Sequence, residues 1–101
     1  MDLQQRINAF VKLGNFLSQF KQEEIKKNDT VIANDLFFDG FKHQIKLAKE
    51  HNGWFTKQNI LFSLESWSNE LNLSTINHWI KKYDFNVLNS KTIAIIMAGN
   101  I

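Results

Sequence analysis

Apolar residues recur every three or four positions through the first eighty residues, and this spacing places them on one face of an α-helix. The first helix is predicted to begin behind Asp2, whose carboxylate can cap it, and to run to about Lys21. Residues 22–27 either prolong this helix or form a short second one, and the polar residues 28–30 end it. The apolar face of the first helix consists of Leu3, Ile7, Phe10, Val11, Gly14, Leu17 and Phe20.

The same spacing predicts three further helices, over residues 35–50, 57–71 and 75–83. Their caps are expected to be Asn34 or Asp35, then Thr56, then Ser74. Gly40 lies inside the second helix of the predicted order and is expected to mark a close approach between helices. Gly53 is expected to end that helix in a left-handed conformation.

The bulky side chains of these helices supply material for a core, because the chain has nine Phe and three Trp. Trp67 and Trp79 fall on the apolar faces of their helices, so core packing is favoured over a surface that stacks on a ligand. We expect one core that contains Phe10, Leu17, Phe41, Leu64, Trp67, Trp79 and Ile80.

Residues 92–97 break the helical pattern, because they are a nearly continuous apolar run with three isoleucines. Such a run is typical of a strand that is buried on both faces of a parallel sheet. The predicted fold is therefore mainly α: a four- or five-helix cluster followed by one C-terminal β-strand, as the amino-terminal piece of a larger α/β enzyme. Residues 1–83 form the helical region, 84–90 a linker and 91–101 the strand region.

Composition excludes several classes of function. The net charge is only +2, from 12 Lys+Arg against 10 Asp+Glu, and the charges are interspersed, so nucleic acid is not an expected partner. Without cysteine, these residues form neither a disulfide nor a thiolate site. The longest apolar run is far shorter than the roughly 20 residues that span a bilayer. A cytoplasmic protein without a membrane span is expected.

Few polar residues stand at spacings that suggest chemistry. Asp39 and His43 lie four positions apart and could share a metal or a proton, but no third ligand follows at a matching spacing. A solvated helix face explains this pair better, and His51 and His78 stand alone. No metal site is predicted.

Asn100 is the one candidate catalytic residue. An Asn at the carboxyl end of a buried strand can direct its amide protons at a substrate oxygen that gains negative charge, as in an oxyanion hole. From spacing alone, a turn residue that tolerates a left-handed conformation explains Asn100 better.

Three stretches, taken in order, resemble the amino-terminal region of bacterial acyl-CoA reductases, relatives of the fatty-acid reductase of bacterial bioluminescence. Each stretch alone is weak, but together they cover nearly the whole chain. They are Gln4, Arg6, Ile7, Ala9, Phe10, Leu13, Gly14, Phe16 and Leu17; then Asn52-Gly53-Trp54-Phe55-Thr56 with Trp67, Trp79 and Tyr83; and finally residues 91–101.

The resemblance implies an aldehyde-dehydrogenase-like fold, in which a helical start leads into the first strand of a nucleotide-binding domain. Such enzymes reduce a fatty acyl-CoA thioester to an aldehyde with NADPH, through an acyl-cysteine. The resemblance makes Asn100 the oxyanion donor. By the same resemblance, four residues lie beside the nicotinamide and the substrate, and these are Ile96, Met97, Ala98 and Gly99.

The chain departs from such enzymes because it has neither the nucleophilic cysteine nor a glycine-bearing cofactor loop. It is therefore expected to bind no cofactor and to be inactive alone, with the rest of a parent chain as its partner. The alternative is a free-standing helical interaction module whose terminal strand adds to the sheet of a partner. Unpaired apolar strands associate, so residues 91–101 are expected either to pair with the same segment of another copy or to fold back as an irregular tail over the helices, and self-association is favoured at high concentration.

Overall fold

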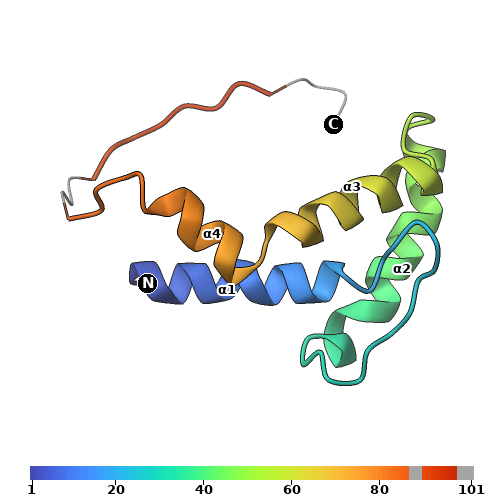
Figure 1. Cartoon of the computed structure of the whole chain (residues 1–101). Helices are drawn as coiled ribbons and strands as arrows, with labels where there is room; N and C mark the ends of the chain where they lie inside the picture. The colour runs from blue at the N-terminus through green and yellow to red at the C-terminus, as the bar shows by residue number, and fades with distance from the viewer. Residues whose placement is uncertain (87–89, 98–101) are drawn as a thin grey trace.

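Four helices form the described part of the chain, residues 1–86 and 90–97 of a computed structural model. Figure 1 shows α1 below a shallow V made by α3 and α4, with α2 standing across one end. Neither described range contains a strand, and one isolated antiparallel bridge joins Phe20 to Ile25. The bounds of the helices are α1 Leu3–Leu17, α2 Asn34–His51, α3 Lys57–Glu70 and α4 Leu73–Ile80.

The predicted C-terminal β-strand is wrong for the residues that the structure describes. Residues 90–97 are extended and exposed, and they form a single segment apart from the helices (Figure 1). A strand exists only where a neighbouring backbone supplies N–H and C=O partners, and the N–H and C=O groups of a helix are already hydrogen-bonded within that helix. The described fold is all-α, and residues 98–101, which carry the end of the predicted strand region, lie outside the described part.

Two of the predicted caps are confirmed. The Asp2 Oδ1 atom accepts a hydrogen bond from the Gln5 backbone N at 2.7 Å, and the Gln5 side chain accepts one from the Asp2 backbone N at 2.9 Å. The Thr56 hydroxyl accepts from the Asn59 backbone N at 3.1 Å. Each cap satisfies a backbone N–H that the first turn of its helix leaves without a partner.

The other caps differ from the prediction. Neither Asn34 nor Asp35 caps α2, whose N-cap position is Ala33 with no side-chain hydrogen bond. The cap of α4 is Asn72 rather than Ser74, since the Asn72 Oδ1 atom accepts from the Thr75 backbone N at 2.9 Å.

The first helix ends at Leu17, earlier than the predicted Lys21, because two side chains compete for its last carbonyl groups. The Ser18 hydroxyl donates to the Asn15 carbonyl at 2.7 Å, and the Gln19 amide donates to the Phe16 carbonyl at 3.0 Å. Residues 18–33 then form a loop, so the helix predicted over residues 22–27 is absent.

The core lies where α1, α2, α3 and the loop meet, and Phe20 is at its centre with no exposed surface. The Phe20 ring centroid lies 5.4, 5.1 and 4.9 Å from those of Phe16, Phe38 and Phe41. The other buried residues of this cluster are Leu17, Ile45 and Leu61.

Three residues of the predicted core are exposed instead. The exposed fractions of Phe10, Trp67 and Trp79 are 54%, 60% and 62%. Helical spacing does not show how much of an apolar stripe a neighbour covers, and the core cluster joins only α1, α2, α3 and the loop. Of the remaining predicted core residues, Leu17 is buried and Phe41, Leu64 and Ile80 are half-buried.

Gly14 makes the close helix approach that was predicted for Gly40. A Cβ atom at Gly14 would overlap the carbonyl oxygen of Leu71, which ends α3, whereas a Cβ atom at Gly40 would meet nothing within 4 Å. Gly53 also departs from the prediction, because its φ is not positive. Thus α1 and α3 cross in contact only because residue 14 has no side chain.

We expect Gly14→Ala to lower the free energy of unfolding by about 1–3 kcal/mol, since backbone must move to admit the methyl group. Gly40→Ala is the matched control. It should raise the free energy of unfolding by about 0.4–1 kcal/mol, because Ala restricts the unfolded chain and meets no neighbour in the folded one. Chemical denaturation followed by circular dichroism measures both. Equal effects of the two substitutions would contradict the close approach at Gly14.

Candidate functional site

Two of the candidate residues near the end of the chain, Ile96 and Met97, are described, and neither is buried against the helices. Ile96 and Met97 lie in the extended segment with exposed fractions of 98% and 67%. Ala98, Gly99 and Asn100 lie outside the described residues. The cofactor and oxyanion roles of these five residues therefore stay predictions.

The charged side chains do not converge on a metal or an acid–base centre. Within residues 1–86 and 90–97, no group of three or more Asp, Glu or His side chains is close enough to hold a metal ion. Asp39 and His43 are both exposed on α2, as a solvated helix face requires. Glu65 has a structural partner, because its carboxylate accepts from the Gln22 backbone N at 3.1 Å and so ties the loop to α3.

A buried pair of carboxamides is the main polar feature that the sequence did not reveal. Gln19 and Asn34 exchange two hydrogen bonds, of 2.8 and 2.7 Å, between their side-chain amides. Both groups also bind Asn28, whose backbone N donates to Gln19 at 2.8 Å and whose carbonyl accepts from Asn34 at 2.8 Å. No buried side-chain polar atom of the described residues lacks a hydrogen-bond partner. The pair therefore fastens the loop to α2 and leaves nothing to bind a ligand.

At least three hollows border the same loop, and the smallest of these three, of about 250 Å³, lies between the loop, α2 and α3. One of about 630 Å³ is lined mainly by charged side chains of both signs, among them Lys21, Glu23 and Lys26. Another, of about 490 Å³, lies between the exposed side chains of Lys12, Ile32 and Leu36. Ser18 lines both of these larger hollows, but its hydroxyl donates to the Asn15 carbonyl at 2.7 Å, and no histidine lines either of them to activate it as a nucleophile.

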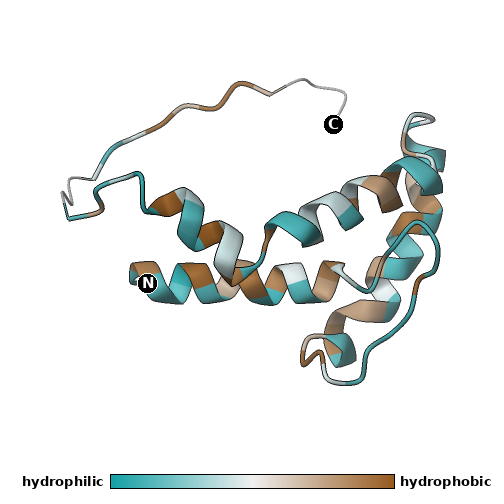
Figure 2. Ribbon diagram, in the orientation of Figure 1, coloured by the Kyte–Doolittle hydropathy of each residue, from teal (hydrophilic) through white to brown (hydrophobic). Residues whose placement is uncertain are grey.

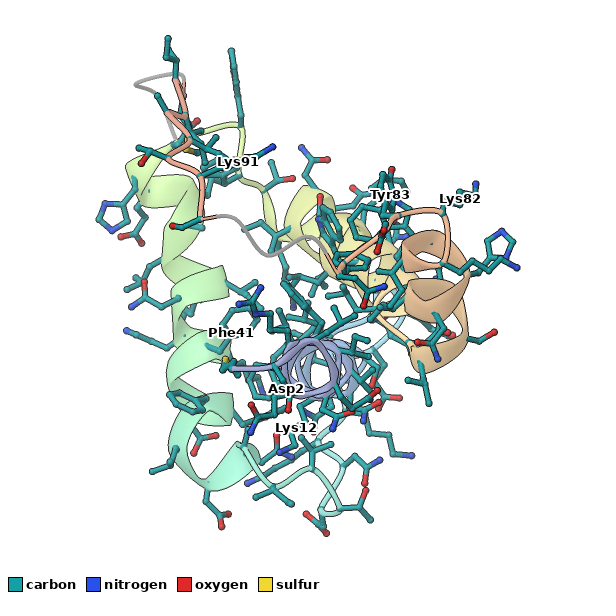
Figure 3. The ribbon with its side chains drawn as sticks, turned by 90° about the vertical axis from the view of Figure 1, so that its left-hand side faces the viewer. Asp2, Lys12, Phe41, Lys82, Tyr83 and Lys91 are labelled. Atoms are coloured by element: carbon teal, nitrogen blue, oxygen red, sulfur yellow. The ribbon has the colours of Figure 1, made fainter. Side chains whose placement is uncertain are left out.

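The most distinctive surface feature is a row of exposed aromatic side chains at the end of α4, formed by Trp79, Tyr83 and Phe85 and called here the aromatic row. The ring centroids of Trp79 and Tyr83 lie 5.9 Å apart, and those of Tyr83 and Phe85 lie 6.5 Å apart, both edge to face. Exposed fractions along the row are 62%, 58% and 44%. Figure 3 labels Tyr83 beside the exposed Lys82.

Further apolar side chains are exposed later in the chain. Figure 2 shows apolar residues on α4 and again along the extended segment after it. In that segment Ile93 and Ile95 have exposed fractions of 80% and 79%. Single exposed apolar residues are ordinary, whereas neighbouring exposed rings such as those of the row form an apolar patch, and large patches of this kind mark interaction surfaces.

Comparison of this chain with family models, curated proteins and solved structures found no match. Among residues 1–86 and 90–97, no helix has the length and apolar character needed to cross a bilayer. The structure by itself defines the class only as an all-α helical unit with an uncovered aromatic surface.

We expect Gln19→Ala and Asn34→Ala each to lower the free energy of unfolding by about 1–3 kcal/mol, since each leaves a buried amide short of a partner. The double variant should lose less than the sum, by a coupling energy of about 0.5–3 kcal/mol. Urea denaturation of the four proteins gives this value. As a control, Gln4→Ala removes an exposed hydrogen bond from the Gln4 side-chain amide to the Asn8 side chain. It should change the free energy of unfolding by at most about 0.5 kcal/mol. Strict additivity of the two core variants would contradict the pairing.

Proposed function

We propose that this chain is the helical amino-terminal part of an NADPH-dependent acyl-CoA reductase, which converts a fatty acyl thioester to an aldehyde. The resemblance of three stretches to such enzymes supports the proposal. The structural observation that carries it is the exposure of residues 92–97, because this segment holds Ile96 and Met97, two of the residues that the resemblance places beside the substrate. It makes no packing contact with the core cluster and is free to be buried elsewhere.

The residues of this chain do not account for the chemistry alone. Acyl transfer from a thioester needs a nucleophile such as a thiolate, and the sequence has no cysteine. Ile96 and Met97 are exposed and apolar, so they do not form a pocket for a nicotinamide by themselves. In this proposal the rest of the enzyme binds NADPH and supplies the thiolate, and Asn100 donates a hydrogen bond to the thioester oxygen.

The coding sequence beyond Ile101 gives the first test. An open frame with a cysteine codon well downstream agrees with the proposal. A stop codon directly after Ile101 would contradict it and favour the alternative, a free-standing helical interaction module. The exposed aromatic row is the observation that favours this alternative, since Trp and Tyr are common at the centres of protein interfaces.

Purified as 101 residues, the chain should not oxidise NADPH in the presence of a long-chain acyl-CoA, because no thiolate can take up the acyl group. In the full-length protein, Asn100→Ala should lower kcat by roughly 10²–10³ if the amide stabilises the oxyanion. Loss of NADPH absorbance measures both reactions. If kcat falls by less than about threefold, Asn100 is a turn residue, because removal of an oxyanion donor lowers kcat far more than that.

Residues 91–101 should make the isolated chain self-associate, because Ile93, Ile95 and Ile96 are exposed on a segment without a backbone partner in the described structure. Sedimentation at increasing concentration should show a rising average mass for the 101-residue chain and a constant mass for a version that ends at Ser90. If both remain monomeric, residues 91–101 do not mediate association.

A further inference from the structure

We propose that Asn52 is a site of spontaneous deamidation, and that the turn between α2 and α3 controls the rate of the reaction. Asn52 is the C-cap residue of α2, and the exposed Gly53 follows it (Figure 1). The site is far in sequence from residues 92–97, so its chemistry does not depend on the proposed reductase function.

The reaction joins the Asn52 side chain to the backbone of Gly53. The Gly53 nitrogen attacks the Asn52 Cγ atom, and its proton passes through water to the departing amide group, which leaves as ammonia. The product is a five-membered imide. Water then adds to one of its two carbonyl carbons, and the ring opens to Asp or to isoaspartate. Glycine favours the attack because it has no Cβ to crowd the nitrogen, and a Cβ at Gly53 would meet nothing within 4 Å, so the surroundings are open as well.

The turn holds the two reacting atoms apart. Ring closure requires the Asn52 Cβ and the Gly53 nitrogen to be nearly eclipsed about the Cα–C bond of Asn52. At the observed ψ of 115° these two atoms point away from each other. Two hydrogen bonds keep this conformation, because Asn52 Oδ1 accepts from the Trp54 backbone N at 3.0 Å and the Asn52 carbonyl accepts from the Phe55 backbone N at 2.9 Å. The reaction therefore requires the turn to open.

Opening the turn disturbs little else in the described structure. Trp54 has an exposed fraction of 73%, and the core cluster with the side chains packed against it includes none of residues 52–55. One further bond ties the turn to α3, since the Asn59 side-chain amide donates to the Trp54 carbonyl at 3.1 Å. Segments with few buried contacts open locally while the rest of the protein stays folded.

Asn8 and Asn77 provide internal controls. They lie inside α1 and α4, and the residues that follow them, Ala9 and His78, carry a Cβ. A helix also fixes each backbone in place through its hydrogen bonds. Both the sequence and the conformation therefore disfavour ring closure at these two positions.

Deamidation changes the end of α2. It replaces a neutral amide by a carboxylate and so lowers the formal net charge by one unit from +2. A negative charge at the C-terminal end of a helix opposes the helix dipole. Isoaspartate also lengthens the backbone by one methylene group, so this product does not fit the turn that Asn52 makes with Trp54 and Phe55.

Mass spectrometry of peptides tests the proposal on the 101-residue chain, incubated at neutral pH in buffer or in guanidinium chloride. In the denaturant, Asn52 should lose ammonia faster than Asn8 and Asn77. Folding should slow the reaction at Asn52 by about tenfold or more, because two hydrogen bonds must break before the ring can close. Equal rates at Asn52 in the folded and the unfolded chain would overturn the control by the turn. Equal rates at the three Asn residues of the unfolded chain would overturn the site itself.

Two variants separate the chemistry from the turn. Gly53→Ala should suppress the reaction at Asn52 in the folded and the unfolded chain, and the fold accepts this change because the φ of Gly53 is not positive. Asn59→Ala should speed the reaction about two- to tenfold in the folded chain only, since it removes one bond that holds the turn closed. Circular dichroism verifies that both variants are folded. An undiminished rate in Gly53→Ala, or an equal acceleration of folded and unfolded Asn59→Ala, would contradict the proposal.

Discussion

The arrangement of the helices depends on the phenyl ring of Phe20, which is fully buried although it lies beyond the end of α1. Its contacts with Phe16, Phe38 and Phe41 join α1 to α2, two helices that are separated in sequence by a sixteen-residue loop. Because the ring comes from the loop, burying it also brings the loop back against both helices. A large buried aromatic group of this kind contributes more to stability than any single polar contact on the surface.

Local signals predicted the helices well. The four main helices appear near their predicted positions, and Asp2 and Thr56 cap α1 and α3 because each needs only a backbone N–H three residues away. Asn34 failed as a cap for a reason that lies outside its own segment: its amide is held by Gln19, fifteen residues earlier. The pattern of residues along α2 does not indicate a hydrogen-bond partner in a distant segment such as Gln19.

The strand over residues 92–97 could not be judged from its own composition. An apolar, β-branched segment forms a strand only when another backbone is present, and the described helices offer none. The exposure of Trp67 and Trp79 has a related cause, since an apolar stripe shows which side of a helix avoids water but not how much of its length a neighbour covers. Asn100 and its neighbours were identified by resemblance alone. The aromatic row could not be predicted, because it depends on the contacts of the Tyr83 ring with the rings of Trp79 and Phe85 after the end of α4.

The Gln19–Asn34 pair has a consequence for the uniqueness of the fold. Phenyl rings attract one another in many orientations, so an aromatic cluster alone would accept several arrangements of the loop. A half-turn of one amide sets donor against donor and acceptor against acceptor, and a half-turn of both breaks the bonds that Gln19 accepts from the Asn28 N–H and Asn34 donates to the Asn28 carbonyl, so one orientation fits. The rings therefore supply most of the attraction, and the two amides select a single loop conformation among those that the rings would permit.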